Sequence, residues 1–316
     1  MSDGTARQRM GSSVRRLIVY AVWDRRGGVD DYIPHALSAL RPHASRILVV
    51  VNGGLSEDGR RKLSSVADEI LVRENSGFDI GAHQAAIVHL GRSIENYDEV
   101  VFTNDTWFGP VGSWARLFER MDSRSVHFWG MTDHAEQVPH PLTGDGVLPC
   151  HLQSFWIAVR REMFTSAGWR AYWRELPALD DYIDAVLKHE AQFTRHFDRL
   201  GFTHEAAFPH GDFSTENPSL LEPERLIEAG CPVLKRRPFF HWPPFLDSHA
   251  VIGRWTLEAA RSAGYPVELA LQNLARNVPP RVLNADAGLF DVVSDYLVGY
   301  DAARPPRVVV IAHIFY

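Results

Sequence analysis

Short apolar segments alternate with helical segments along the first third of the chain, and this alternation restricts the fold more than any other feature of the sequence. The apolar segments are rich in Val, Ile and Leu and cover residues 16–24, 45–53, 69–75 and 99–105. Segments with a helical pattern lie between them, at residues 33–40, 56–67 and 81–91. Strands that are apolar at nearly every position are typical of a parallel sheet with helices on both faces. The sequence therefore predicts an α/β fold with a mainly parallel sheet flanked by helices.

Polar residues follow each predicted strand, where open α/β sheets bind their ligands. Asp24 follows the first strand and Asn52 ends the second. The third strand leads into residues 74–79, which include Asn75, and the fourth leads into Asn104-Asp105-Thr106. We therefore expect one binding site at this edge of the sheet.

The segment ENSGFDIGAHQAAI, residues 74–87, places Gly77, Asp79 and Gly81 between a strand and a helix. Backbone N–H groups at such a helix start favour an anion such as a diphosphate. The alternative is a tight turn in which Asp79 is only a helix N-terminal charge. The segment lacks GxGxxG, so it does not indicate a dinucleotide site, and an oxidoreductase is disfavoured.

In TNDTWFGP, Asp105 is a candidate ligand for Mg²⁺ or Mn²⁺, because these ions prefer oxygen ligands and often take only one or two from the protein. A helix-capping role is the alternative. Because Gly109-Pro110 interrupts the chain before the next helix, we expect Asp105 to lie in a loop. Together with the glycine turn, it suits a nucleotide diphosphate bound between backbone donors and a divalent cation.

Composition disfavours several classes of protein. The net charge is -6, which argues against a nucleic-acid partner. The two cysteines are too few for a disulfide framework, and no His or Cys spacing is typical of zinc. No apolar run approaches the roughly 20 residues that span a bilayer. We expect a cytoplasmic location, with peripheral contact at the inner membrane face through Arg15 and Arg16 as an option.

The remaining sequence predicts further helices and strands and a division into regions. Strands are expected at residues 126–133 and 154–161, helices at 113–121, 163–176, 180–201, 252–276 and 289–299, and a last strand at 307–316. We expect a disordered tail over 1–15, a main domain over 16–245, a helical extension over 246–305 and a final strand over 306–316. That strand either completes the sheet or begins a second, truncated domain.

Blocks of sequence resemble the rhamnan synthesis protein F family over about residues 15–245. These blocks include ENSGFDIGAH, YDEVVFTNDTWFGPV, HFWGMTDH, HLQSFWIAVRREMF, KHEAQFTRHFDRLGF and PVLKRRPFF. The resemblance implies a GT-A-like glycosyltransferase of polysaccharide biosynthesis that acts on a polysaccharide or lipid-linked glycan acceptor. It implies a nucleotide-sugar donor of rhamnose type, such as dTDP-rhamnose.

The resemblance also implies roles for individual residues. Asn104-Asp105-Thr106 corresponds to the acidic DxD-type motif of GT-A enzymes, but only Asp105 is acidic here. A metal-free alternative would place Lys235, Arg236 or Arg237 against the diphosphate. Glu190 matches the position of the catalytic base in inverting enzymes, and it could instead be a solvated helix residue.

Asp133, at the end of a predicted strand, is the competing candidate for the base. Polar and aromatic residues before the strand at 154–161 suit a pyranose ring and form the expected acceptor site, although strand-edge hydrogen bonding is the alternative. These residues are His151, Gln153, Ser154 and Trp156. The second functional hypothesis is a catalytically weak nucleotide- or glycan-binding domain of a larger synthase.

Overall fold

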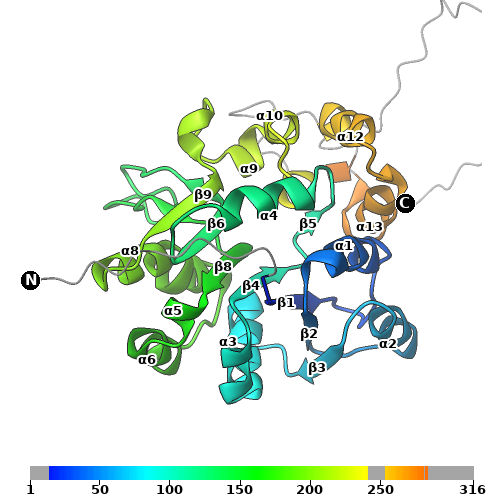
Figure 1. Ribbon diagram of the computed structural model, residues 1–316. Coiled ribbons are helices and arrows are strands. Elements are labelled where there is room, and N and C mark those ends of the chain that lie inside the picture. Colours follow the sequence, from blue (N-terminus) through cyan, green and yellow to red (C-terminus); the bar gives the residue numbers. More distant parts are fainter. Residues whose placement is uncertain (1–13, 241–252, 281, 284–316) are drawn as a thin grey trace, which may run out of the picture.

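The computed structural model describes residues 14–240, 253–280 and 282–283. In this part of the chain an eight-stranded mixed sheet forms the centre of the molecule, with helices on both faces (Figure 1). The strand order is β3-β2-β1-β4-β8-β6-β7, and β9 pairs with β6. The strands are β1 (Arg16–Trp23), β2 (Arg46–Asn52), β3 (Glu69–Arg73), β4 (Glu99–Asn104), β6 (Phe128–His134), β7 (His151–Leu152), β8 (Trp156–Arg160) and β9 (His204–Phe208).

The four strands β1 to β4 form the parallel half of the sheet, as predicted. In the central pairs, Tyr20 lies opposite Val49 of β2 and Thr103 of β4. Residues 17–22 are at most 3% exposed, because helices cover both faces of β1. The unbroken apolar pattern of β1, β2 and β4 follows from their burial, while β3 at the edge of the sheet is only partly buried.

The other half of the sheet contains a reversal that the sequence did not indicate. β8 is antiparallel to both β4 and β6, whereas β9 is parallel to β6. β6 therefore runs in the same direction as β4. As a result, the carboxyl ends of β1, β2, β4 and β6 meet the residues that precede β8 at one edge of the sheet.

Helices pack on both faces of the sheet. Their buried side chains form two separate hydrophobic clusters with those of the strands, one on each face. The bounds of the helices are α1 (Tyr32–Leu40), α2 (Glu57–Ser64), α3 (Phe78–Leu90), α4 (Trp114–Asp122), α5 (Arg161–Phe164), α6 (Ala167–Glu175), α7 (Tyr182–Asp184), α8 (Ala191–Arg199), α9 (Pro218–Leu221) and α10 (Pro223–Glu228). A π-helical turn, η3 (Ala185–Glu190), joins α7 to α8. Short 3₁₀ turns are η1 (Arg41–His43), η2 (Gly91–Asn96), η4 (His210–Asp212) and η5 (Arg237–Phe239).

The helix predicted over residues 252–276 is two helices, α12 (Gly253–Ser262) and α13 (Val267–Asn277). Gly264, at φ 90°, and Pro266 separate them. α12 contacts α10, and α13 contacts α1. The helix expected at 289–299, the strand at 306–316 and most of the N-terminal tail lie outside the described residues, and the domain limits stay predictions.

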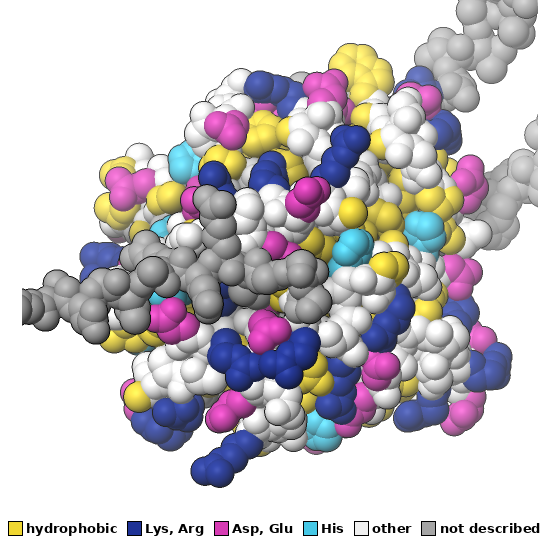
Figure 2. Space-filling model, in the orientation of Figure 1, with side chains coloured by type: hydrophobic (Ala, Val, Ile, Leu, Met, Phe, Trp, Pro, Cys, Tyr) yellow, Lys and Arg dark blue, Asp and Glu magenta, His cyan; other side chains and the backbone are white. Residues whose placement is uncertain are grey.

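The surface of the described residues is mixed in charge. Figure 2 shows Lys and Arg side chains interspersed with Asp and Glu over the face in view. No helix in the described ranges is both long enough and apolar enough to cross a bilayer.

Candidate active site

A cavity of about 850 Å³ lies at the edge of the sheet where the carboxyl ends of β1, β2 and β4 meet. Most of the polar residues predicted from the sequence line it, although they come from separate elements. Those lining it are Asp24, Asn52, Asn75, Asp79, Asn104, Asp105, His151, Gln153, Ser154, Glu190 and Lys235. The edge that the strand pattern predicted is therefore the edge with the cavity.

Asp105 lies in the loop after β4, as the break at Gly109-Pro110 predicted. The next helix, α4, begins nine residues later and is capped by Ser113, so Asp105 caps no helix. Its carboxylate Oδ2 accepts a hydrogen bond from the backbone N–H of Trp23 at 3.1 Å. Burial raises the pKa of Asp105 to about 6, although the nearby Arg236 guanidinium acts in the opposite direction.

The turn before α3 places Asp79 beside this loop. The Asn104 side-chain amide donates a hydrogen bond to Asp79, while Asn104 Oδ1 accepts one from the Thr106 hydroxyl at 2.6 Å. The charge of Asp79 is one of the factors that raise the pKa of Asp105, so the two carboxylates act on each other. Asp79 thus brings a second carboxylate to a motif that has only one in the sequence.

Gly77 and Gly81 shape this turn and do not line the cavity. Gly77 has φ 68°, a left-handed conformation that glycine adopts without strain. A Cβ at Gly81 would lie 2.4 Å from the carbonyl oxygen of Ser76. The close approach of these two segments fixes where α3 begins and therefore where Asp79 lies.

Two basic residues reach the loop of Asp105 and Thr106 through a strand pair too short to be predicted from sequence. β5 (Trp107–Phe108) pairs antiparallel with β10 (Leu234–Lys235), which places Lys235 opposite Trp107. Lys235 Nζ donates to the Thr106 hydroxyl at 2.8 Å, and burial lowers the pKa of Lys235 to about 8. Arg236 donates to the backbone oxygen of Asp105 at 2.6 Å.

Glu190 lies at the end of the π-helical turn η3, another part of the cavity wall. Its Oε2 accepts hydrogen bonds from the backbone N–H of Ser154 at 2.8 Å and from the Ser154 hydroxyl at 2.6 Å. His151 Nε2 lies 3.9 Å from Glu190 Oε1, and the His151 ring stacks on His134. π-helical turns are frequent at functional sites, because the extra residue redirects a side chain.

The structure corrects the expectation for Trp156, which was assigned to the acceptor site. Its side chain is 0% exposed and stacks on Trp114 in the hydrophobic core, with 5.0 Å between ring centroids. Trp129 of β6 is equally buried. Both rings belong to the same hydrophobic cluster on one face of the sheet, because side chains on a strand alternate between faces. Phe155, the neighbour of Trp156, lines the cavity.

Asp133 also lies away from the cavity lining. Its carboxylate accepts hydrogen bonds from the backbone N–H of His210 at 2.6 Å and from His210 Nδ1 at 2.9 Å. Cys150 lies close to both, and the potential ligand atoms of the three residues are within 4.8 Å of one another. The contacts of Asp133 therefore fit a structural Asp–His pair better than a base in the cavity.

Gln153 lines the cavity, but its amide is engaged in the fold. Its Oε1 accepts a hydrogen bond from Thr132 at 2.6 Å, and its Nε2 donates to Asn217 at 3.2 Å. His151 and Ser154 also line the cavity while they are hydrogen-bonded within the fold, His151 to the Pro149 carbonyl and Ser154 to Glu190.

The sequence did not indicate that helix α13 lines the same cavity. Asn273, Arg276 and Asn277 of α13 are part of the wall, together with Asp30 of the loop before α1. No local motif marks these residues, since only the packing of α13 brings them to the site.

The donor atoms near Asp105 fit a hard cation. The carboxylates of Asp79 and Asp105 and the hydroxyl of Thr106 are oxygen ligands of the kind that Mg²⁺ and Mn²⁺ prefer. Lys235 donates to the Thr106 hydroxyl and Arg236 to the backbone oxygen of Asp105, so two protein cations also lie next to this loop. The arrangement supports the predicted metal ligand Asp105 without requiring a metal.

The fold and the cavity define an α/β protein. Charged residues line a cavity at the edge of its sheet where the carboxyl ends of the parallel strands lie. The chain belongs to the rhamnan synthesis protein F family, whose family model matches residues 47–316.

Curated relatives share part of the chain. The uncharacterized protein y4gN of Sinorhizobium fredii is 27% identical over 158 residues, which are 49% of this chain and 39% of that protein. The virulence protein VirA of Vibrio anguillarum is 34% identical over 89 residues, which are 28% of this chain and 27% of that protein. The chain thus matches well under half the length of these relatives.

Solved structures match this chain with low TM-scores and low sequence identity. Glucosyl-3-phosphoglycerate synthase from Mycobacterium tuberculosis, in complex with Mg²⁺ and uridine diphosphate, has a TM-score of 0.41 and 16% identity, and 81% of each chain is covered. A putative nucleotide-diphospho-sugar transferase from Desulfovibrio desulfuricans has a TM-score of 0.36 and 11% identity, with 62% of this chain and 81% of that chain covered.

Proposed function

We propose that this chain is a glycosyltransferase of GT-A type that moves a sugar from a nucleotide-diphosphate sugar to a growing cell-surface polysaccharide or lipid-linked glycan. Membership of the rhamnan synthesis protein F family supports this class and favours a rhamnose-type donor, such as dTDP-rhamnose. The observation on which the proposal depends is that one cavity contains both Lys235 and Arg236, which suit a diphosphate, and the carboxylate of Glu190.

The donor diphosphate would bind beside the loop of Asp105. Lys235 and Arg236 supply positive charge there, and the first residues of α3, residues 78–80, line the same cavity, where a helix N-terminus favours an anion. A Mg²⁺ or Mn²⁺ ion held by Asp105, with Asp79, would neutralise the charge that develops on the leaving diphosphate. Protein cations and a metal ion are compatible at this site.

Glu190 is the proposed general base. It would take the proton of an acceptor hydroxyl while that oxygen bonds to the anomeric carbon and the bond from this carbon to the diphosphate breaks. Attack on the face opposite the leaving group inverts the anomeric centre. The two hydrogen bonds from Ser154 hold the carboxylate in place, and His151 and Ser154 line the wall where an acceptor would bind.

Binding and transfer assays test this proposal. The purified protein is mixed with thymidine, uridine and guanosine diphosphates, with and without Mn²⁺, and its thermal unfolding is measured. Stabilisation by thymidine diphosphate above the other two would support the rhamnose-type donor, since a ligand that binds the folded state raises the melting temperature. No stabilisation by any nucleoside diphosphate at millimolar concentration would contradict the proposal.

A catalytically weak binding domain is the second candidate, because the motif Asn104-Asp105-Thr106 has a single carboxylate. Such a domain would bind the nucleotide but release no diphosphate from the nucleotide-sugar in the presence of acceptor. A position at the inner face of the cytoplasmic membrane stays a prediction, which co-sedimentation with anionic lipid vesicles would test.

A further inference from the structure

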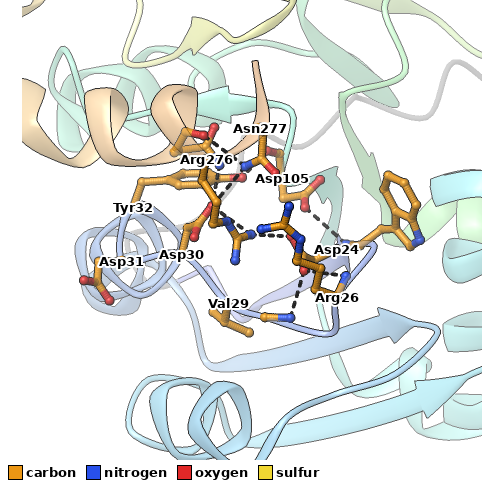
Figure 3. Close-up of polar contacts among 12 residues, drawn as sticks. Asp24, Arg26, Val29, Asp30, Asp31, Tyr32, Asp105, Arg276 and Asn277 are labelled. Atoms are coloured by element: carbon orange, nitrogen blue, oxygen red, sulfur yellow. Dashed lines mark hydrogen bonds and ion pairs between the residues drawn. The ribbon is translucent and has the colours of Figure 1, made fainter. Parts of the chain in front are cut away.

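Helix α13 contacts the loop between β1 and α1 through one polar face. Asn273, Arg276 and Asn277 are spaced i, i+3 and i+4, so they share that face. Arg276 Nη2 forms ion pairs with Asp24 and, at 3.2 Å, with Asp30 (Figure 3). The contact between Arg276 and Asp24 joins residues 252 positions apart in the sequence.

This loop is also the one to which Asp105 is bound. Figure 3 shows Asp105 beside the loop, and its Oδ2 accepts the N–H of Trp23, the residue before Asp24. Arg276 therefore lies next to the proposed diphosphate site. Gly28 allows the close approach, because a Cβ there would lie 2.7 Å from Arg276 Nη1.

The charges that line the cavity are balanced in the described part of the chain. Five carboxylates, of Asp24, Asp30, Asp79, Asp105 and Glu190, face five basic side chains, of Arg25, Lys235, Arg236, Arg237 and Arg276. A nucleoside diphosphate adds two or three negative charges to this set. Its binding is favoured if a basic group is released from a carboxylate to contact it.

Among these five basic residues, Arg276 is the one that the described part of the chain holds in ion pairs with carboxylates. All its polar contacts with described residues use Nη2, and its Nε has no hydrogen-bond partner among them. After release of Arg276, Asp24 Oδ1 would still accept the hydrogen bonds from the backbone N–H groups of Arg26 and Gly28, both at 2.9 Å. Asp30 would still accept hydrogen bonds from the side-chain amides of Asn273 and, at 3.5 Å, of Asn277. Neither carboxylate would be left without a donor.

We infer that Arg276 is a diphosphate-binding residue and that α13 is part of the donor site. In the free protein, Asp24 and Asp30 neutralise its guanidinium; when the donor binds, the guanidinium moves to the phosphate oxygens, whose geometry suits its paired N–H groups. This inference depends on the proposed function, because it takes the ligand to be a nucleoside diphosphate.

The test is a double-mutant cycle on the affinity for the nucleoside diphosphate that stabilises the wild type most, measured by titration calorimetry. R276M is expected to weaken binding about tenfold, the size typical of a charge-assisted hydrogen bond. D30N removes a competing carboxylate and is expected to strengthen binding. The increase in affinity caused by D30N should be at least about threefold smaller in the R276M background, because D30N acts through Arg276.

Controls separate this role from a purely structural one. R261M alters an arginine of α12 that pairs with Glu258 on the surface and should leave the affinity unchanged. The uncharged nucleoside should bind wild type and R276M equally. Unchanged diphosphate affinity in R276M, or additive effects of R276M and D30N, would overturn the inference alone. No binding of any nucleoside diphosphate to the wild type would overturn the proposed function as well.

Discussion

Ser154 donates both its backbone N–H and its hydroxyl to one oxygen of Glu190, at 2.8 and 2.6 Å. This double contact fixes the carboxylate at the cavity wall, although the two residues are 36 positions apart. A base that is held in one orientation loses little freedom when the acceptor binds.

The first prediction is that E190Q lowers the turnover number about 10²- to 10⁴-fold, because the amide cannot take a proton. Nucleotide affinity should stay within about twofold, since the amide oxygen can still accept from Ser154. Transfer from the radiolabelled donor sugar, with calorimetry for binding, measures both. E205Q, at a half-buried residue of β9 that pairs with Arg124 away from the cavity lining, is the matched control. Full turnover in E190Q would remove Glu190 from the mechanism.

The second prediction concerns Asp105, whose pKa burial raises to about 6. The folded protein favours the protonated carboxyl of Asp105. This group therefore stabilises the fold fully below the pKa near 4 that Asp has in the unfolded chain, and the stabilisation is lost as the pH rises through about 6. D105N should therefore stabilise the protein relative to wild type at pH 7.5 by on the order of 1 kcal/mol, and less at pH 5. Urea unfolding at both pH values measures the difference.

Asp145, exposed in the loop before β7, supplies the control variant D145N, which should show no such pH dependence. If D105N were less stable than wild type at pH 7.5, the charged form of Asp105 would be favoured by the fold, contrary to our interpretation.

The third prediction concerns Lys235, whose pKa burial lowers to about 8. The positive charge is lost as the pH rises through this value, so the dissociation constant for a nucleoside diphosphate should rise by up to about tenfold between pH 7 and pH 9. In K235R the dependence should be weaker, because arginine stays charged over this range. Equal pH profiles for the two proteins would show that Lys235 does not bind the diphosphate.

The fourth prediction concerns the turn before α3. G81A should destabilise the protein by about 1–3 kcal/mol, because the added methyl group would lie 2.4 Å from the Ser76 carbonyl oxygen. Displacement of Asp79 should also weaken nucleotide binding. G211A is the control, since no atom lies within 4 Å of a Cβ at that position. Urea midpoints of the two variants should differ clearly, and equal midpoints would show that the turn adjusts freely.

The strands of the parallel half were predictable from local sequence. β1, β2, β3 and β4 lie within the predicted segments. In β1, β2 and β4 the burial of both faces demands an unbroken apolar run, whereas the edge strand β3 is only partly buried. β9 was missed, since its sequence HEAAF is only partly apolar and its first residues are half-buried. The reversal of β8 was also missed, because an apolar run has no direction.

The sequence by itself determined which polar residues follow the strands, and so placed Asp105, Asp79 and Asn52 at one edge of the sheet. It could do so because strand ends are encoded locally, by the change from apolar to polar residues. It could not exclude Trp156, since the face to which a strand residue points depends on the packing of the whole sheet.

Only the tertiary structure decided which charges meet at that edge. The two-residue ladder of β5 and β10 brings Lys235 to Thr106 and Arg236 to the backbone oxygen of Asp105, and Arg276 reaches Asp24 from α13. These contacts join distant parts of the chain, so no local pattern encodes them. Burial then sets the pKa values of Asp105 and Lys235, because the cost of a charge depends on what surrounds it and not on its neighbours in sequence.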